Sequence, residues 1–238
     1  MDDSIDAIFF DLDDTLFDAT GLAEKARHAA IEAMIEKGLE GVTADSGYEI
    51  LKEIVDEFGS NADNHFNLLL KRLDQPSVKL VSIAVITYHT IKVKDIKLFP
   101  DVFGFLLDIK NETGCRLGII TDGLAIKQYE KILRLGLDPF FPDVFISDEI
   151  GIRKPNPKLF TWALEKTEVA PARSLYVGDR FDYDIVPAKR ACMKTCLVHR
   201  GGKHDKPIDD TSKKLIDFEV RDLGELWKSI QGVLKPRA

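Results

Sequence analysis

Short apolar runs alternate with helical patterns along the second half of the chain. The runs predict four strands, at Leu117–Ile120, Val144–Ser147, Leu175–Val177 and Thr195–Val198. Between them, apolar residues recur at helical spacing, which predicts helices at Leu124–Leu135, Pro157–Lys166 and Tyr183–Ala191. An unbroken apolar run near the start, Ala7–Phe10, is typical of a strand buried on both faces. Because strands that alternate with helices form βαβ units, the pattern predicts an α/β fold with five parallel strands.

Residues 20–92 break this alternation, because four helical patterns follow one another there. The second of them is predicted to open with a capping box of Ser46 and Glu49 and to end at Gly59. A further helix after Pro100 then returns the chain to the α/β pattern. We therefore expect a three-layer, Rossmann-like parallel-sheet core at residues 1–18 and 94–238, with a four-helix cap inserted at residues 19–93.

Composition excludes several kinds of partner. The chain has 238 residues and 45% hydrophobic content, enough to bury a large core. Its net charge of -7 argues against a broad basic surface for nucleic acid or for an anionic membrane. Three cysteines without disulfide-like density fit a reducing compartment, and neither a signal peptide nor a spanning helix is expected. We expect a cytoplasmic protein, either a monomer or a homodimer.

Polar residues follow the predicted strands at the points where those strands end. Asp11 and Asp13 come after the first strand, and the later strands are followed in turn by Thr121, Lys154 and Asp179. Because the carboxyl ends of parallel strands meet at one edge of a sheet, these side chains are expected to lie close together. Carboxylate oxygens suit Mg²⁺ better than zinc, so the set predicts a magnesium site.

Such a site is suited to a phosphate monoester that meets a carboxylate nucleophile. Two like unit charges about 4 Å apart repel by roughly 4 kcal/mol at an effective dielectric constant of about 20. A magnesium ion together with Lys154 would reverse this repulsion. Asp11 and Asp13 are two residues apart, so on an extended chain they would face the same side. One carboxylate could then attack phosphorus while the other protonates the leaving oxygen.

Four stretches resemble, in order, the motifs of the haloacid dehalogenase superfamily. They are DLDDT (residues 11–15), IITDG (119–123), IRKPNPKLF (152–160) and VGDRFDYDI (177–185). The resemblance implies that Asp11 forms an aspartyl-phosphate and that Asp13 acts as general acid and then as general base. It implies that the substrate phosphate is bound by Thr121, Asp122, Gly123 and Lys154. It also implies that Mg²⁺ is held by Asp11, Asp13 through its backbone carbonyl, Asp179 and Asp184.

Three details around these motifs stay open at this point. Asp182 is a rival of Asp184 for the last acidic position, because the spacing of the fourth motif varies within the family. Arg180 stands where many members carry a small hydroxyl residue. After the second motif, Lys127, Gln128 and Lys131 are interpreted as a solvated helix face.

The aspartate at position 13 favours phosphoryl transfer, since dehalogenases of this family typically lack it. We therefore predict a phosphatase acting on a small phosphorylated metabolite, with phosphomutase or 2-haloacid dehalogenase as alternatives. The stretch from Thr121 to Leu137 and the helical insert look most like an archaeal branch of glyceraldehyde 3-phosphate phosphatases, which implies that substrate or phosphoglycolate. A non-enzymatic alternative is a phospho-receiver domain, because Asp148 and Glu149 follow the third predicted strand.

Overall fold

The computed structural model describes residues 4–59 and 62–237, and the chain forms two compact units. The core unit comprises Met1–Asp18 and Lys97–Ala238, and the insert unit comprises Ala19–Ile96. The second boundary lies three residues beyond the predicted end of the insert, because its last helix continues to Asp95.

A parallel sheet forms the centre of the core unit, in the strand order β3-β2-β1-β4-β5-β6. The strands are β1 (Ala7–Phe10), β2 (Arg116–Thr121), β3 (Asp143–Ile146), β4 (Ser174–Gly178), β5 (Lys194–Val198) and β6 (Phe218–Val220). The predicted α/β class and its five strands are confirmed, and β6 is an addition that the sequence analysis missed. It has three residues and only one of them, Val220, is buried, so it carries little apolar signal.

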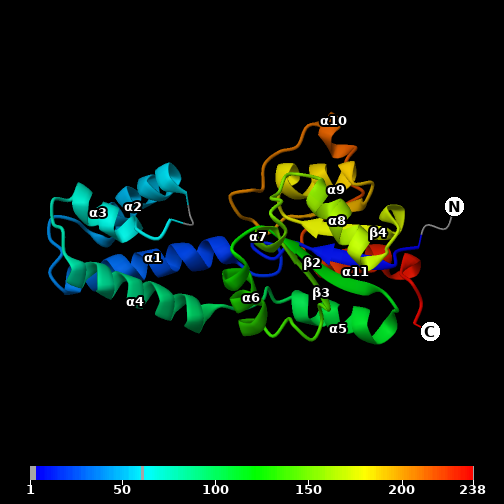
Figure 1. The fold of residues 1–238 in the computed structure, drawn as a ribbon, viewed down its shortest axis with the longest axis horizontal. Helices are drawn as coiled ribbons and strands as arrows, with labels where there is room; N and C mark the ends of the chain where they lie inside the picture. Colours follow the sequence, from blue (N-terminus) through cyan, green and yellow to red (C-terminus); the bar gives the residue numbers. More distant parts are fainter. Residues whose placement is uncertain (1–3, 60–61, 238) are drawn as a thin grey trace. The chain divides into compact units, whose positions relative to one another are not determined.

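Helices cover both faces of this sheet. The principal ones are α5 (Val102–Glu112), α6 (Ala125–Arg134), α8 (Lys158–Thr167), α9 (Val186–Arg190) and α11 (Leu223–Ile230). Phe9 of β1 packs into one cluster with α8 and α9, whereas its neighbour Phe10 packs edge-on against Phe105 of α5. In Figure 1, α8 and α9 accordingly lie on the opposite side of the sheet from α5. The core unit thus has the three predicted layers.

Several predicted element boundaries are wrong. Ser147 does not end β3 but begins a short helix, α7 (Ser147–Ile150). The predicted helix at 183–191 is a π-helical turn, Phe181–Ile185, followed by α9. A short helix, α10 (Asp210–Lys213), lies between β5 and β6, and its N-cap is Asp209. The last helix, α11, ends at Ile230 and is followed by a 3-10 turn, Gln231–Val233.

The strand order reverses around β1, which pairs with β2 on one side and with β4 on the other. Sheets of this type bind ligands beyond the carboxyl ends of the strands at such a switch point. The first, second and fourth motifs lie at the carboxyl ends of these three strands. The topology therefore brings together residues that are more than one hundred positions apart in the chain.

Where the structure describes the insert unit, it has four helices, α1 (Ala19–Glu36), α2 (Ala44–Phe58), α3 (His65–Arg72) and α4 (Val78–Asp95). Lys25 near the start of α1 pairs with Asp95 at the end of α4, 2.6 Å apart, so these two helices run antiparallel. The predicted capping box of Ser46 and Glu49 is wrong. Thr43 is the N-cap of α2: its hydroxyl accepts from the backbone N–H of Ser46, and the hydroxyl of Ser46 accepts from the backbone N–H of Thr43. Within the described residues, no helix is long and apolar enough to cross a membrane.

Candidate active site

The chain leaves β1 in a way that keeps Asp11 beside the sheet and then turns sharply. The backbone N–H of Asp11 donates to the carbonyl of Val177 at 2.9 Å, which extends the pairing of β1 with β4 by one residue. Asp14 then adopts a positive φ of 58°, and the N–H of Leu16 donates back to the carbonyl of Leu12 at 3.0 Å. The first motif is therefore a strand end followed by a tight turn.

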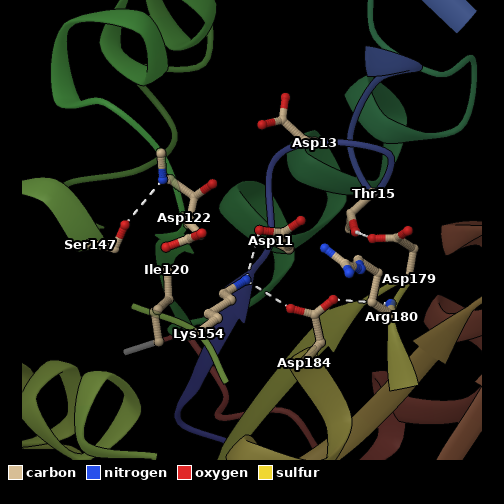
Figure 2. A network of polar contacts seen from close by, with 12 residues as sticks. Asp11, Asp13, Thr15, Ile120, Asp122, Ser147, Lys154, Asp179, Arg180 and Asp184 are labelled. Atoms are coloured by element: carbon tan, nitrogen blue, oxygen red, sulfur yellow. Dashed lines mark hydrogen bonds and ion pairs between the residues drawn. The ribbon is translucent and has the colours of Figure 1, made fainter. Parts of the chain in front are cut away.

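Lys154 is the centre of a buried polar network (Figure 2). Its ammonium donates to Asp11 Oδ1 and to Asp184 Oδ1, each at 2.7 Å, and to the hydroxyl of Tyr176 at 2.5 Å. The Tyr176 hydroxyl donates in turn to the carbonyl of Ile120 at 3.0 Å. Because all three side-chain partners of Lys154 are buried, its charge is compensated inside the protein.

The protonation equilibria of this network are strongly perturbed. Burial has the largest effect on Asp11 and raises its pKa to about 7, although the positive charge of Lys154 acts to lower it. Burial and the neighbouring Asp184 and Asp11 carboxylates raise the pKa of Asp179 to about 8. For Lys154, burial alone would lower the pKa, but the charges of Asp11 and Asp184 outweigh it and raise the pKa. One ammonium therefore does not neutralise the three carboxylates of the cluster.

Asp11, Asp179 and Asp184 form a group that fits a divalent cation. One carboxylate oxygen from each lies within 4.8 Å of the others, and all three residues are buried. Three hard oxygen donors with excess negative charge match Mg²⁺ and do not match a soft metal. The carboxylate of Asp13 lies outside this group, and the contact that the family resemblance implies for Asp13 is made by its backbone carbonyl.

The structure distinguishes the two rival acids of the fourth motif. Asp182 is exposed, whereas Asp184 is 1% exposed and accepts a hydrogen bond from the backbone N–H of Arg180 at 3.0 Å. A Cβ atom at Gly178 would lie 2.5 Å from Cγ of Asp184, so glycine is needed to leave room for that carboxylate. The π-helical turn thus directs Asp184 inward and Asp182 outward.

Asp13 faces away from Asp11 in the structure (Figure 2). Both of its carboxylate oxygens accept from the ammonium of Lys131 at 2.7 Å, and Oδ2 also accepts from Nε2 of Gln128 at 3.1 Å. The same Nε2 donates to the hydroxyl of Thr121 at 2.7 Å. The interpretation of Gln128 and Lys131 as a solvated face is therefore wrong. Only Lys127 of that set is exposed, because α6 turns the other two toward the first motif.

Two predicted phosphate-binding residues have other partners here. The carboxylate of Asp122 is bound by the guanidinium of Arg153, with Nη2 to Oδ2 at 2.8 Å. The backbone N–H of Gly123 donates to the hydroxyl of Ser147 at 3.0 Å. Arg180 stacks on the ring of Tyr183, with 3.8 Å between Cζ and the ring centroid. Of the predicted set, the side chains of Asp11, Lys154, Asp179 and Asp184 thus cluster, while Asp13 and Thr121 are linked through Gln128.

Sequence reasoning missed Tyr176, Gln128 and Lys131. Tyr176 lies in the middle of an apolar strand, where an aromatic residue is ordinary core. Gln128 and Lys131 lie three residues apart on a helix with many charged residues, as on any solvated face. The available signal was their position in the helix that directly follows the second motif.

We expect the Tyr176→Phe substitution to lower the free energy of unfolding by about 1–2 kcal/mol, because a buried hydrogen-bond network loses one member and Lys154 loses an acceptor. Urea denaturation followed by circular dichroism measures this effect. Tyr129→Phe is the matched control, since the Tyr129 hydroxyl makes an exposed contact of 3.4 Å with Glu149. Equal stabilities of the two variants would contradict the inferred role of Tyr176.

Comparisons with known proteins agree with this geometry. Residues 8–198 match the family model described as haloacid dehalogenase-like hydrolase. A curated relative from Methanopyrus kandleri, named glyceraldehyde 3-phosphate phosphatase, is 45% identical over 97% of this chain and 99% of its own length.

Two solved structures share the fold. The HAD phosphatase from Thermococcus onnurineus aligns with a TM-score of 0.67 and 26% identity, over 97% of this chain and 100% of its own. The magnesium-bound YfnB protein of Bacillus subtilis aligns with a TM-score of 0.69 and 23% identity, over 95% of this chain and 99% of its own. The chain therefore belongs to the haloacid dehalogenase-like hydrolase family and is an enzyme of its phosphatase branch.

Proposed function

We propose that the chain hydrolyses the phosphate monoester of a small metabolite through an aspartyl-phosphate at Asp11. The supporting observation is the contact of Asp11 with Lys154 inside a buried cluster that also holds Asp179 and Asp184. The first candidate substrate is glyceraldehyde 3-phosphate, because the full-length relative from Methanopyrus kandleri is named for that activity. Phosphoglycolate is the second candidate.

The proposed first step forms a bond between a carboxylate oxygen of Asp11 and phosphorus, and breaks the bond from phosphorus to the ester oxygen. Lys154 and the hydroxyl of Thr121 donate to the phosphoryl oxygens, where negative charge spreads in the transition state. Asp11, Asp179 and Asp184 would hold Mg²⁺, with a further contact from the backbone carbonyl of Asp13. When bound, the ion supplies positive charge that offsets the repulsion between the phosphate and Asp11.

Asp13 is proposed to handle the protons. In the first step it gives a proton to the leaving alkoxide, which becomes the alcohol product. In the second step it takes a proton from a water molecule as that water attacks the aspartyl-phosphate, which releases inorganic phosphate and restores Asp11. One residue thus serves both half-reactions and ends each cycle in its starting protonation state.

A side-by-side substrate screen tests this function. Purified protein with Mg²⁺ is given p-nitrophenyl phosphate, glyceraldehyde 3-phosphate, phosphoglycolate and phosphoserine, and released phosphate is measured. We expect turnover of several monoesters, with the largest kcat/KM for glyceraldehyde 3-phosphate. A 2-haloacid serves as the control for dehalogenase chemistry, and halide release without phosphate release would overturn the proposal. Phosphate release from none of the esters would also overturn it.

Addition of Mg²⁺ is expected to stabilise the fold, because the ion would bind the clustered carboxylates of the folded state only. At a free concentration 100-fold above the dissociation constant, the expected gain is about 2.7 kcal/mol in unfolding free energy. Thermal melting with about 10 mM Mg²⁺, compared with melting in EDTA, measures this gain in stability. The Asp179→Asn variant is the control, since it removes one donor of the group. An equal shift in both proteins would place the metal elsewhere.

Family membership argues against the receiver-domain alternative. Asp148 lies in α7 after the edge strand β3, and its carboxylate accepts from the backbone N–H of Ala125 at 3.0 Å. A phosphomutase would use the same acids, and the screen separates it by the release of free phosphate. We further propose that the enzyme acts in the cytoplasm as a monomer or homodimer. Its free thiols at Cys115, Cys192 and Cys196 support a reducing compartment.

A further inference from the structure

A buried amide on α6 connects two catalytic groups of the proposed reaction. Gln128 is 1% exposed, and its Nε2 lies 2.7 Å from the hydroxyl oxygen of Thr121 and 3.1 Å from Oδ2 of Asp13. Thr121 ends β2, whereas Asp13 lies in the turn after β1, and the two residues belong to different motifs. A side-chain amide has two N–H donors, so Gln128 can supply both contacts at once.

Lys131 determines which way this amide faces. Its ammonium lies 2.6 Å from Oε1 of Gln128, and an ammonium can only donate, so Oε1 must be the acceptor there. Nε2 is thereby directed toward Thr121 and Asp13. The ammonium of Lys131 also donates to both oxygens of Asp13 at 2.7 Å, and the ring of Phe17 lies 5.9 Å from it. The positive charge of Lys131 therefore determines which end of the amide is the oxygen and which is the nitrogen.

The direction of the Gln128 contact decides what Thr121 can do. A hydroxyl has one donor hydrogen and two acceptor positions. Because Gln128 donates to it, the oxygen of Thr121 acts as acceptor in this contact and its own hydrogen is kept for another partner. Thr121 ends β2, next to the end of β1 at which Asp11 lies, so that hydrogen is available to a phosphoryl group there.

The backbone next to Thr121 is shaped to receive this side chain. Gly123 adopts a φ of 151°, and a Cβ atom added there would lie 3.2 Å from Cδ of Gln128. A larger residue at 123 would press against the amide. The glycine of the second motif thus leaves space for Gln128, although its backbone N–H is directed to Ser147.

We infer that Gln128 is a positioning residue that orients the Thr121 hydroxyl toward the transferring phosphoryl group and holds Asp13, with Lys131 fixing the amide. This inference rests on the proposed phosphatase function. Gln128 contacts no reacting atom itself. Gln128 therefore affects the reaction only through Thr121 and Asp13. Its effect on kcat should consequently depend on whether those residues are intact, which a double-mutant cycle measures.

The experiment measures kcat and KM for p-nitrophenyl phosphate with saturating Mg²⁺ in a set of variants. Gln128→Met keeps the length of the side chain and removes its amide, and we expect kcat to fall about tenfold or more with little change in KM. Lys127→Met is the matched control, since Lys127 is exposed on the same helix, and it should leave kcat unchanged. Melting temperatures verify that each variant is folded.

A double-mutant cycle separates positioning from general damage. If Gln128 acts through the hydroxyl of Thr121, adding Gln128→Met to Thr121→Val should cost severalfold less than it costs in the wild-type protein. Effects that multiply independently would overturn the inference. Lys131→Met supplies a second test at a side chain that is only partly buried, so it disturbs the packing less than a change at Gln128 does. Compared with Lys131→Met, Lys131→Arg should restore most of the lost kcat, because arginine keeps a donor to Oε1 of Gln128.

The outcomes distinguish this inference from the function on which it rests. A wild-type protein that turns over no ester, or that matches Asp11→Asn, overturns the proposed function and the role of Gln128 together. An active wild type in which Gln128→Met and Lys131→Met both behave like Lys127→Met overturns the positioning role alone.

Discussion

Replacement of Asp11 by asparagine is expected to lower phosphate release by on the order of 10⁴-fold or more, the largest effect of any single change proposed for this enzyme. Asparagine has nearly the shape of aspartate but lacks the anionic oxygen that attacks phosphorus. The buried contact of Asp11 with Lys154 at 2.7 Å places that oxygen beside a cation able to bind the incoming phosphate. Released phosphate is measured for wild type and variant with p-nitrophenyl phosphate.

The matched control for this change is Asp182→Asn, which removes an exposed carboxylate close in sequence to the site. It should retain nearly full activity, because Asp184 and not Asp182 faces Lys154. When the reaction with a substrate labelled at its phosphorus atom is quenched with acid, label should also remain bound to the wild-type protein. No label should remain bound to Asp11→Asn. Activity of the variant within tenfold of wild type, or label that persists in it, would show that another residue is the nucleophile.

Replacement of Lys154 by methionine is expected to affect both activity and stability. Removal of one partner from a buried ion pair leaves uncompensated charge and typically costs about 3–5 kcal/mol. Here Asp11 and Asp184 would both lose the ammonium that they share at 2.7 Å. The phosphoryl oxygens would also lose a donor, so we expect kcat to fall by about 10²–10³-fold.

The loss of stability in Lys154→Met should be greater at high pH than at low pH. In the wild type, the pKa of Asp11 is already raised to about 7 by burial, and removal of the Lys154 charge would raise it further. A carboxyl whose folded pKa exceeds its unfolded pKa destabilises the fold at high pH, and this penalty declines as pH falls through the folded value. The deficit of Lys154→Met should therefore be largest above pH 7 and smaller at pH 5.5.

Urea denaturation without metal at pH 8 and pH 5.5 measures this dependence. Lys158→Met is the control, because that lysine is exposed in the first turn of α8 and its removal should change stability little at either pH. A deficit for Lys154→Met that is the same at both pH values would contradict the charge-based explanation and would point to packing instead.

Residues at strand ends were predictable from sequence. A strand buried on both faces is an unbroken run of apolar residues, and the first charged residue after the run marks the end of the strand. Asp11 after Phe10 and Asp179 after Gly178 are of this kind. The alternation of apolar runs with helical patterns allowed the fold class to be predicted as well. Element boundaries were less accurate where local patterns competed, as at Ser147, which the apolar run placed in a strand and which begins α7.

The sequence alone could not predict contacts between distant segments. Lys131 and Asp13 are 118 residues apart, and their ion pair exists because β1 and β2 are neighbours and α6 follows β2. No local pattern distinguishes such a lysine from a solvated one. The same holds for Tyr176, whose hydroxyl finds its partners only when β4 lies beside β1.

For this protein, the sequence by itself determined the α/β class, the strand ends and the residue types available for chemistry, since these depend on hydrophobic period and local spacing. The tertiary structure decided which carboxylates share a site, which of Asp182 and Asp184 faces inward, and that Gln128 links Thr121 with Asp13. The physical reason is that burial, charge pairing and hydrogen bonding act through space. Only the packed sheet brings their partners within reach.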